Sequence, residues 1–565
     1  MNSLVLLVIS IIVLVCGYIF YGGWLCKQWG VGESKEETPA HAMEDGVDYV
    51  PAKAPVLMGH HFSSIAGAGP ITGPIGAAMF GWLPVTLWIL VGGIFFGGVH
   101  DFGALFASIR HKGQSIGEII SANMSRRAKR LFIIFAYLTL ILVVAAFASI
   151  VASTFGGATA AETTDSQASV AMVSILFIVI AIVFGFLVYR RNAPMAVASV
   201  IGVIAIIAIM AIGMNFHPIK LSSNAWMWIV GVYIAIASVT PVWILLQPRD
   251  YLSSFLLYAM LFVAVVGVVG AHPNIDSTLF PAFAGFAVDN GNGIQYMFPV
   301  LFTTVACGAI SGFHSLVSSG TTSKQLDKEM DAKPIAYGGM LLECVLAVLT
   351  LCAIAYARQI GTTAGATDIF AGGIAGMVAA IPGLAGAQNT LYTLLVLTYS
   401  AFCLTSLDTA TRLARFMFQE FWLEPGQTVG DVKEGYKKLM VNPYFATIIT
   451  VILGVLLGLN GYGKIWGLFG AANQLLAGIG LLAVATWLGN IGRNNKMFLF
   501  PMGFMIIVTI CSLALTVKNQ IGIISAGGAD WGPYAQVIIG ALLIVLAIVL
   551  VIEGVQTLSR KKAAA

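Results

Sequence analysis

The sequence predicts an all-α polytopic membrane protein built of two inverted repeats, on three observations: its hydropathy, a series of long apolar segments, and a repeated glycine–histidine motif. Of the 565 residues, 58% are hydrophobic and 10% are charged, and the mean hydropathy is +0.91. A water-soluble fold cannot bury so much apolar surface, so the lipid bilayer is the expected solvent. This composition excludes a soluble enzyme.

Fifteen apolar segments are long enough to cross a bilayer, which takes about 20 helical residues. We place them at 2–24, 57–78, 81–106, 129–153, 171–189, 195–214, 226–247, 252–270, 298–323, 336–357, 391–418, 443–459, 465–488, 497–516 and 534–556. The first lacks the basic start and the small-residue cleavage site of a signal peptide. Residues 1–25 are therefore predicted to be an extra N-terminal transmembrane helix.

Basic residues gather in alternate loops, which predicts the topology because cytoplasmic loops are rich in Lys and Arg. These alternate loops and the C-terminal tail contain Arg110, Lys112, Arg126, Arg127, Lys129, Arg130, Arg190, Arg191, Arg249, Lys324, Lys328, Lys333, Lys433, Lys437, Lys438, Arg493, Lys496, Arg560, Lys561 and Lys562. The opposite loops 154–169 and 271–297 have none. We expect the bacterial cytoplasmic (inner) membrane, the N-terminus outside, the C-terminus inside, and a solvated cytoplasmic linker at 26–56 and tail at 557–565.

The same charges and the cysteines exclude other partners. The basic residues form no single patch, so no nucleic-acid partner is predicted. None of the seven cysteines forms a CxxC pair, so neither a disulfide framework nor a metal site is predicted.

The repeat is visible in two nine-residue segments, GHHFSSIAG at 59–67 and GFHSLVSSG at 312–320. Seven predicted membrane crossings separate the start of the first copy from the start of the second. Because each crossing reverses the direction of the chain through the membrane, an odd number makes the two copies cross it in opposite directions. Such inverted repeats are typical of secondary transporters. Repeat one is predicted at 57–270 and repeat two at 298–556.

The loops favour one arrangement of these repeats. Long loops at 107–128 and 358–390 follow the second helix of each repeat, and the second loop contains DIFAGGIAGMVAAIPGL, an apolar run too short to span and better suited to a re-entrant or interfacial helix. This pattern is similar to the leucine-transporter fold of the amino acid–polyamine–organocation superfamily, a five-plus-five inverted repeat with broken first helices, here with two further helices after each repeat. A seven-plus-seven inverted repeat is the alternative.

Residues 59–76 are the least helix-like stretch within a predicted span. Gly67, Gly69, Pro70, Gly73 and Pro74 predict that the helix unwinds here. Unwound backbone at membrane depth is suited to binding anions and cations, although a proline kink packed against neighbouring helices explains the same residues. The predicted substrate-binding residues of this segment are His60, His61, Ser63, Ser64, Gly67 and Gly69.

Histidines in these spans ionise near neutral pH and suit proton transfer or carboxylate binding, or are merely interfacial. The second repeat motif adds His314, Ser315, Ser318 and Ser319 as predicted substrate-binding residues, and its hydroxyls bind either substrate or their own helix. His100 and Asp101 are neighbours on a helix and are expected to point in different directions. Glu343 and the pair Asn473–Gln474 are weaker polar candidates.

Asp408 lies well inside the segment 391–418, and intramembrane carboxylates are usually functional. With Ser406, Thr409 and Gly67 it is predicted to hold the coupling ion, a proton or alternatively Na⁺. The competing interpretation is an ion pair with Arg412, four residues later on the same helix face.

Two long stretches, GHHFSSIAGAGPITGPIGAAMFGWLP and GGVHDFGALFASIRHKGQSIGEI, closely resemble the carbon starvation protein A family of bacterial transporters, and SGFHSLVSSGTTSKQL and TSLDTATRLARF are similar to it as well. The resemblance implies uptake of peptides or of pyruvate, driven by the proton gradient, in cells short of carbon. It implies a small-molecule substrate and no cofactor. A passive channel or facilitator and a membrane-embedded starvation sensor are the alternatives, and no HExxH or nucleotide-binding motif supports an enzyme. Oligomeric state is not predicted.

Overall fold

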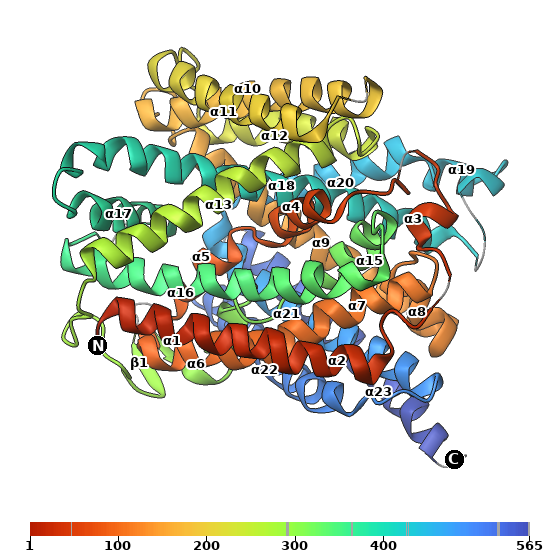
Figure 1. Cartoon of the computed structure of the whole chain (residues 1–565). Helices are drawn as coiled ribbons and strands as arrows, with labels where there is room; N and C mark the ends of the chain where they lie inside the picture. The colour runs from red at the N-terminus through yellow and green to blue at the C-terminus, as the bar shows by residue number, and fades with distance from the viewer. Residues whose placement is uncertain are drawn as a thin grey trace.

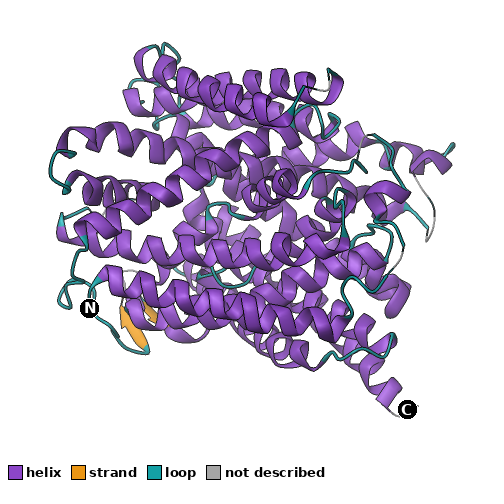
Figure 2. Cartoon of the chain, in the orientation of Figure 1, coloured by secondary structure: helices purple, strands orange, loops and turns teal. Residues whose placement is uncertain are grey.

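The computed structural model describes residues 1–34, 36–46, 48–191, 193–289, 293–362, 365–424, 427, 429–527 and 531–562. These residues are almost entirely helical (Figure 2). Strands β1 (Ala287–Asp289) and β2 (Ile294–Tyr296) pair antiparallel, with Ala287 opposite Tyr296. The molecule is therefore all-α apart from this small ribbon.

The helices follow one another along the chain with short connections. They are α1 (Ser3–Cys16), α2 (Gly22–Trp29), α3 (Pro39–Ala42), α4 (Ala54–Ile65), α5 (Gly69–Ala77), α6 (Trp82–Gly92), α7 (Gly98–Arg110), α8 (Ile116–Asn123), α9 (Arg126–Phe155), α10 (Asp165–Gly185), α11 (Met195–Asn215), α12 (Ser223–Val239), α13 (Leu246–Ala271), α14 (Met297–Thr304), α15 (Gly312–Gly320), α16 (Gly338–Gln359), α17 (Ala366–Ala379), α18 (Gln388–Trp422), α19 (Tyr436–Met440), α20 (Pro443–Gly458), α21 (Tyr462–Asn490), α22 (Lys496–Ser525) and α23 (Trp531–Lys562). Short π-helical turns join α1 to α2 and α6 to α7 into longer rods.

Eleven helices of the described chain are long and apolar enough to cross a membrane. The shorter apolar helices α12 and α20 and the two broken helices, α4–α5 and α14–α15, bring the segments to the fifteen that the sequence predicts. One boundary is wrong: the predicted segment 226–247 ends as a helix at Val239, and α13 begins at Leu246. The termini lie at opposite ends of the helix bundle (Figure 1), as an odd number of crossings requires.

Local sequence explains where several helices begin. Asn2, Ser115 and Ser125 each accept a hydrogen bond from a backbone N–H in the first turn of α1, α8 and α9. Thr164 and Gln167 form a reciprocal capping box at α10. Such caps satisfy amides that have no partner within the helix.

The helices of the two repeats pack in matching ways, as an inverted repeat requires. Helix α9 packs on α18, and α12 packs on α20. Helix α13 contacts α4 and the short helix α17, while its counterpart α21 contacts α15 and the short helix α8. Helices α17 and α8 lie at opposite ends of the bundle (Figure 1). The fold is thus leucine-transporter-like, with five paired helices per repeat, and the seven-plus-seven alternative is not followed.

The extra helices of repeat one differ from the prediction. The sequence interpretation placed two further helices after each repeat, and α22 and α23 do follow α21. In repeat one, however, the additional pair is the hairpin α10–α11, which lies between α9 and α12 and packs on α9, α13 and α18. The error arose because a hairpin adds two crossings wherever it is inserted, so loop parity cannot locate it.

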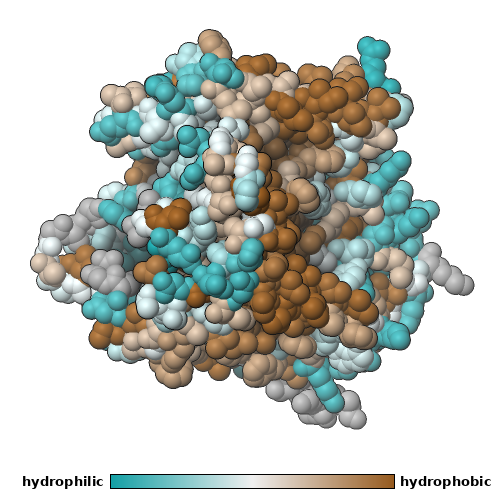
Figure 3. Space-filling view, turned by 60° about the vertical axis from the view of Figure 1, so that its left-hand side comes forward, coloured by the Kyte–Doolittle hydropathy of each residue, from teal (hydrophilic) through white to brown (hydrophobic). Residues whose placement is uncertain are grey.

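A broad part of the outer surface is apolar. Hydrophobic side chains cover a broad area of the face shown in Figure 3, and exposed large residues include Val200, Ile204 and Ile207 on α11. By contrast, the apolar window of α21 is completely buried. The chain is a multi-pass membrane protein whose core is enclosed by helices.

Both helix breaks are shorter than, or displaced from, the predicted ones. In the first, GHHFSSI stays helical in α4 and only residues 66–68 leave the helix. In the second, GFHSLVSSG forms α15 itself and the break lies before it, at 305–311. Pro70 fits because it stands in the first turn of α5, where no intrahelical N–H bond is lost.

The segment 26–56 was predicted to be a solvated linker, and the structure shows much of it docked. Helix α2 continues to Trp29, which is buried and stacks on Phe106 and Phe498. Ala52 pairs through its backbone with Leu326. The segment therefore holds α4 against the chain that follows α15.

Candidate substrate and coupling site

The two helix breaks touch one another in the core. A Cβ atom on Gly69 would lie 2.4 Å from Cys307 Sγ, and one on Gly73 would lie 2.8 Å from the Thr304 carbonyl oxygen. Glycine at these positions lets the two backbones meet. The N-termini of α5 and α15 and the C-termini of α4 and α14 therefore lie at one junction, where positive helix ends suit an anion and negative ends suit a cation.

The predicted substrate-binding residues are all buried; eight of them lie on the two half-helices beside this junction, while Gly67 lies in the first break and Gly69 begins α5. His60, His61, Ser63 and Ser64 belong to α4, and His314, Ser315, Ser318 and Ser319 belong to α15. Ser315 and Ser319 donate to carbonyls of their own helix at 2.7 Å, as the helix-bonding interpretation expects. Ser318 Oγ has no partner among the described atoms.

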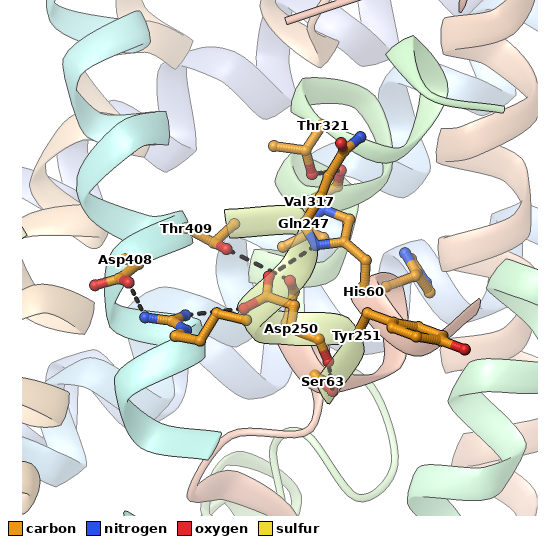
Figure 4. Close-up of polar contacts among 12 residues, drawn as sticks. His60, Ser63, Gln247, Asp250, Tyr251, Val317, Thr321, Asp408 and Thr409 are labelled. Carbon is orange, nitrogen blue, oxygen red and sulfur yellow. Dashed lines mark hydrogen bonds and ion pairs between the residues drawn. The ribbon is translucent and has the colours of Figure 1, made fainter. Parts of the chain in front are cut away.

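An arginine that the sequence interpretation assigned to a loop, Arg249, forms the centre of the first charged cluster. Its partners Asp250 and Asp408 are labelled in Figure 4. Arg249 is buried in the first turn of α13; it donates to Asp250 at 2.9 Å and forms an ion pair with Asp408. Asp250 also hydrogen-bonds His60 Nδ1 at 2.7 Å, and the Tyr233 hydroxyl donates to Asp408 at 2.7 Å. We call these five residues the arginine cluster; it joins α4, α12, α13 and α18.

The competing interpretation of Asp408, an ion pair with Arg412, is wrong. Arg412 instead donates to Asp48 at 3.3 Å and to the carbonyls of Ala237, in the last turn of α12, and of Thr240, directly after it. The early end of α12 exposes these carbonyls to the guanidinium. Asp408 is therefore free to pair with Arg249.

The predicted coupling-ion residues do not form one site. Ser406 donates to the Ser64 carbonyl at 2.9 Å, and Thr409 lies 3.4 Å from the Ser64 hydroxyl, both at the end of α4. A Cβ on Gly67 would also meet Ser406, at 2.9 Å. Asp408 faces the other way, toward Arg249. The helix rotation between positions 406 and 408 explains the division.

A second charged cluster lies on the other side of α15, and we call it the histidine cluster. Asp101 accepts from His100 Nδ1 at 2.7 Å and from His314 Nδ1 at 2.8 Å. His314 Nε2 faces Glu343 of α16 at 3.4 Å. The expectation that His100 and Asp101 point apart is wrong, since both side chains bend toward α15.

Four functional candidates were missed or undervalued from sequence: Tyr233, Arg249, Asp250 and Glu343. Arg249 and Asp250 looked like a loop because they separate two apolar segments. A buried Arg–Asp pair inside an otherwise apolar stretch was nevertheless the available signal. Nothing in the sequence linked Tyr233 to Asp408.

A polar pocket of about 190 Å³ opens at the end of the bundle that holds α8. Its wall includes Ser319 and Gly320 of α15, and Glu118, Lys324 and Glu420 supply its charges. Lys324 lies 4.7 Å from the ring centre of Phe416, and burial lowers the pKa of its ammonium group. The pocket therefore reaches the end of the half-helix that carries His314.

Two broken helices in inverted repeats, with buried charges between them, define a membrane transporter of the leucine-transporter fold rather than an enzyme. The chain belongs to the carbon starvation protein CstA family, whose model matches residues 2–362 and 353–512.

Relatives with curated names cover most of the chain. The peptide transporter CstA of Bacillus subtilis is 30% identical over 92% of this chain and 91% of its own length. The Escherichia coli pyruvate/proton symporter BtsT is 29% identical over 91% of this chain and 81% of its own length. Among solved structures, a mutant manganese transporter of Eremococcus coleocola aligns with a TM-score of 0.51 and 13% identity, over 92% of this chain and 99% of that chain. This last likeness concerns the fold alone.

Proposed function

We propose that this transporter imports a small carboxylate-bearing nutrient, a peptide or pyruvate, by symport with protons. It acts in the bacterial cytoplasmic membrane with its N-terminus outside and its C-terminus inside. The named peptide and pyruvate/proton transporters among its relatives support the substrate class and the ion. The alternation of basic loops supports the orientation.

The observation that carries this proposal is the junction of the two breaks. Helices α5 and α15 both begin there, so two positive helix ends converge where the half-helices meet. A substrate carboxylate is stabilised by such ends and by hydrogen bonds from unwound backbone. Both peptides and pyruvate carry a carboxylate that this junction would stabilise.

Proton coupling is proposed for the arginine cluster. Asp408 Oδ1 has no partner among the described atoms, while Oδ2 is held by Arg249 and Tyr233. Protonation of Asp408 would weaken its bond to Arg249 and leave the guanidinium to Asp250 alone. Because these residues join α4 to α12, α13 and α18, the change would act on the packing between a broken helix and its neighbours.

The purified full chain in liposomes should accumulate labelled pyruvate or a labelled dipeptide when the outside is more acidic than the inside. A protonophore should abolish the accumulation, and a sodium gradient alone should not support it. Uptake that only equilibrates the substrate would identify a facilitator. Accumulation driven by a sodium gradient alone would show that the coupling ion is Na⁺ rather than the proton.

Asp408→Asn should lower the initial rate of pH-driven uptake by roughly tenfold or more, corresponding to about 1.4 kcal/mol or more in the barrier. Exchange of internal for external substrate should persist, because the amide keeps the shape and leaves Asp250 to pair with Arg249. Asp165→Asn is the matched control, since Asp165 is exposed and bonds Lys220 at the start of α10. Accumulation by Asp408→Asn equal to that of the wild type at every pH would exclude Asp408 as the coupling carboxylate.

A further inference from the structure

Three potential metal ligands converge beside the second break. The ligand atoms of Cys307, His314 and Glu343 all lie within 4.8 Å of one another, and the three residues are buried. Cys307 comes from the unwound segment, His314 from the first turn of α15, and Glu343 from α16. Three separate elements thus direct a thiol, an imidazole and a carboxylate at one point.

The hydrogen bonds around the site show that His314 Nε2 and the oxygens of Glu343 face each other as lone pairs, while the Cys307 thiol donates to Ser311 Oγ at 3.5 Å. A carboxylate only accepts, so Asp101 places a proton on Nδ1 of both His100 and His314. His314 Nε2 is then an acceptor. It has no hydrogen-bond partner among the described atoms, and neither have the two oxygens of Glu343. Acceptors that face one another in a buried site require a positive charge between them.

The spacing suits a metal ion better than a shared proton. His314 Nε2 and Glu343 Oε2 are 3.4 Å apart, which exceeds the usual length of a hydrogen bond. Two ligands that bind one tetrahedral ion at about 2.1 Å lie roughly 3.4 Å apart. Nitrogen and oxygen therefore already stand at the separation that a common ion imposes.

The charge of the site and the hydrogen bond on the far side of the His314 ring favour the same conclusion. Asp101 and Glu343 are two buried carboxylates, and in the described part of the chain they form ion pairs with histidines only. A divalent ion offsets two of the three negative charges that the site holds when Cys307 loses its proton and binds as a thiolate. Asp101 also bonds the far nitrogen of His314, and a carboxylate in this position orients a metal-binding imidazole and increases its basicity.

We propose that Cys307, His314 and Glu343 bind a divalent transition-metal ion of the zinc, cobalt or ferrous class. Thiolate and imidazole favour such ions over Mg²⁺ or Ca²⁺. Three protein ligands leave one coordination position for water or another small ligand. The ion would fasten the unwound segment to α15 and α16. The site lies at the junction proposed for the substrate, but its test by metal titration does not depend on the proposed substrate or coupling proton.

The test is a titration of the metal-stripped full chain in detergent with Co²⁺. We expect one ion per chain and a thiolate-to-cobalt charge-transfer absorption, which reports Cys307 directly. Cys307→Ser should remove this absorption, and Asp101→Asn should weaken binding roughly 10- to 100-fold. Cys352→Ser is the control, because Cys352 is a buried thiol of α16 that contacts only the Ser3 carbonyl among the described hydrogen bonds.

The absorption spectrum of the wild-type protein with Co²⁺ tests the metal site even where a variant fails to fold. Saturating Co²⁺ without the charge-transfer absorption would overturn the proposal. So would binding that Cys307→Ser and Glu343→Gln leave unchanged in monodisperse protein. Absence of any Co²⁺ or Zn²⁺ binding would show that the lone pairs share a proton instead, and the metal site would be wrong.

Discussion

Arg249→Met should abolish uptake and lower the free energy of unfolding by about 3–5 kcal/mol, the cost of leaving buried charges without their partner. Arg249 is the cation shared by Asp250 and Asp408 in the arginine cluster. Its loss leaves two carboxylates close together in a buried site, and His60 is the remaining partner of Asp250. Thermal unfolding in detergent and uptake in liposomes measure the two effects.

A second substitution separates charge from packing. Adding Asp408→Asn to Arg249→Met removes one of the uncompensated carboxylates, so the double variant should regain part of the lost thermal stability while uptake stays abolished. Arg191→Met is the matched control, because Arg191 is exposed at the end of the α10 segment and should leave both measurements unchanged. An Arg249→Met protein as stable as the wild type would contradict the buried ion pair.

Gly312→Ala should also be severe, because α15 and α21 meet there through their backbones. The added Cβ would lie 2.2 Å from the Asn473 carbonyl oxygen and 2.5 Å from the Ala477 nitrogen. Neither atom is at the end of a flexible side chain, so the helices must separate. We expect about 1–3 kcal/mol of destabilisation and a loss of uptake, since overpacking in a close-packed core costs this much.

The control for this substitution stands on α21 itself. Gly467 is exposed and has no atom within 4 Å of an added Cβ, and alanine is the better helix former. Gly467→Ala should therefore be neutral or slightly stabilising. Equal thermal unfolding of the Gly312→Ala and Gly467→Ala proteins would show that α15 and α21 are not in backbone contact.

Hydropathy and charge were sufficient to predict the membrane class, the positions of the apolar segments and the inverted repeat. These features are local or periodic. The hairpin α10–α11 was assigned to the wrong place because its insertion preserves loop parity. The breaks were placed too broadly because GHHFSSI and GFHSLVSSG tolerate a helix when tertiary packing supports it, which composition alone does not reveal.

For the candidate site, too, the sequence predicted individual residues but not their tertiary contacts. His60, His61 and His314 were found because ionisable groups stand out in apolar segments. The pairings of His60 with Asp250 and of His314 with Asp101 and Glu343 were not predicted, because these carboxylates reach the histidines from other helices, at sequence distances that only the tertiary fold closes. The choice between Arg249 and Arg412 for Asp408 depended on where α12 ends, a boundary that hydropathy does not fix.

The length of the hairpin α10–α11 also indicates the thickness of the bilayer that this chain fits. Only 22% of the apolar window of α11 is buried, so lipid rather than protein fixes its length. Its 21 residues span about 31 Å, close to the hydrocarbon thickness of an ordinary bilayer, about 30 Å. A much thicker bilayer would have to thin around this hairpin, and the resulting mismatch would act on α9, α13 and α18, on which it packs.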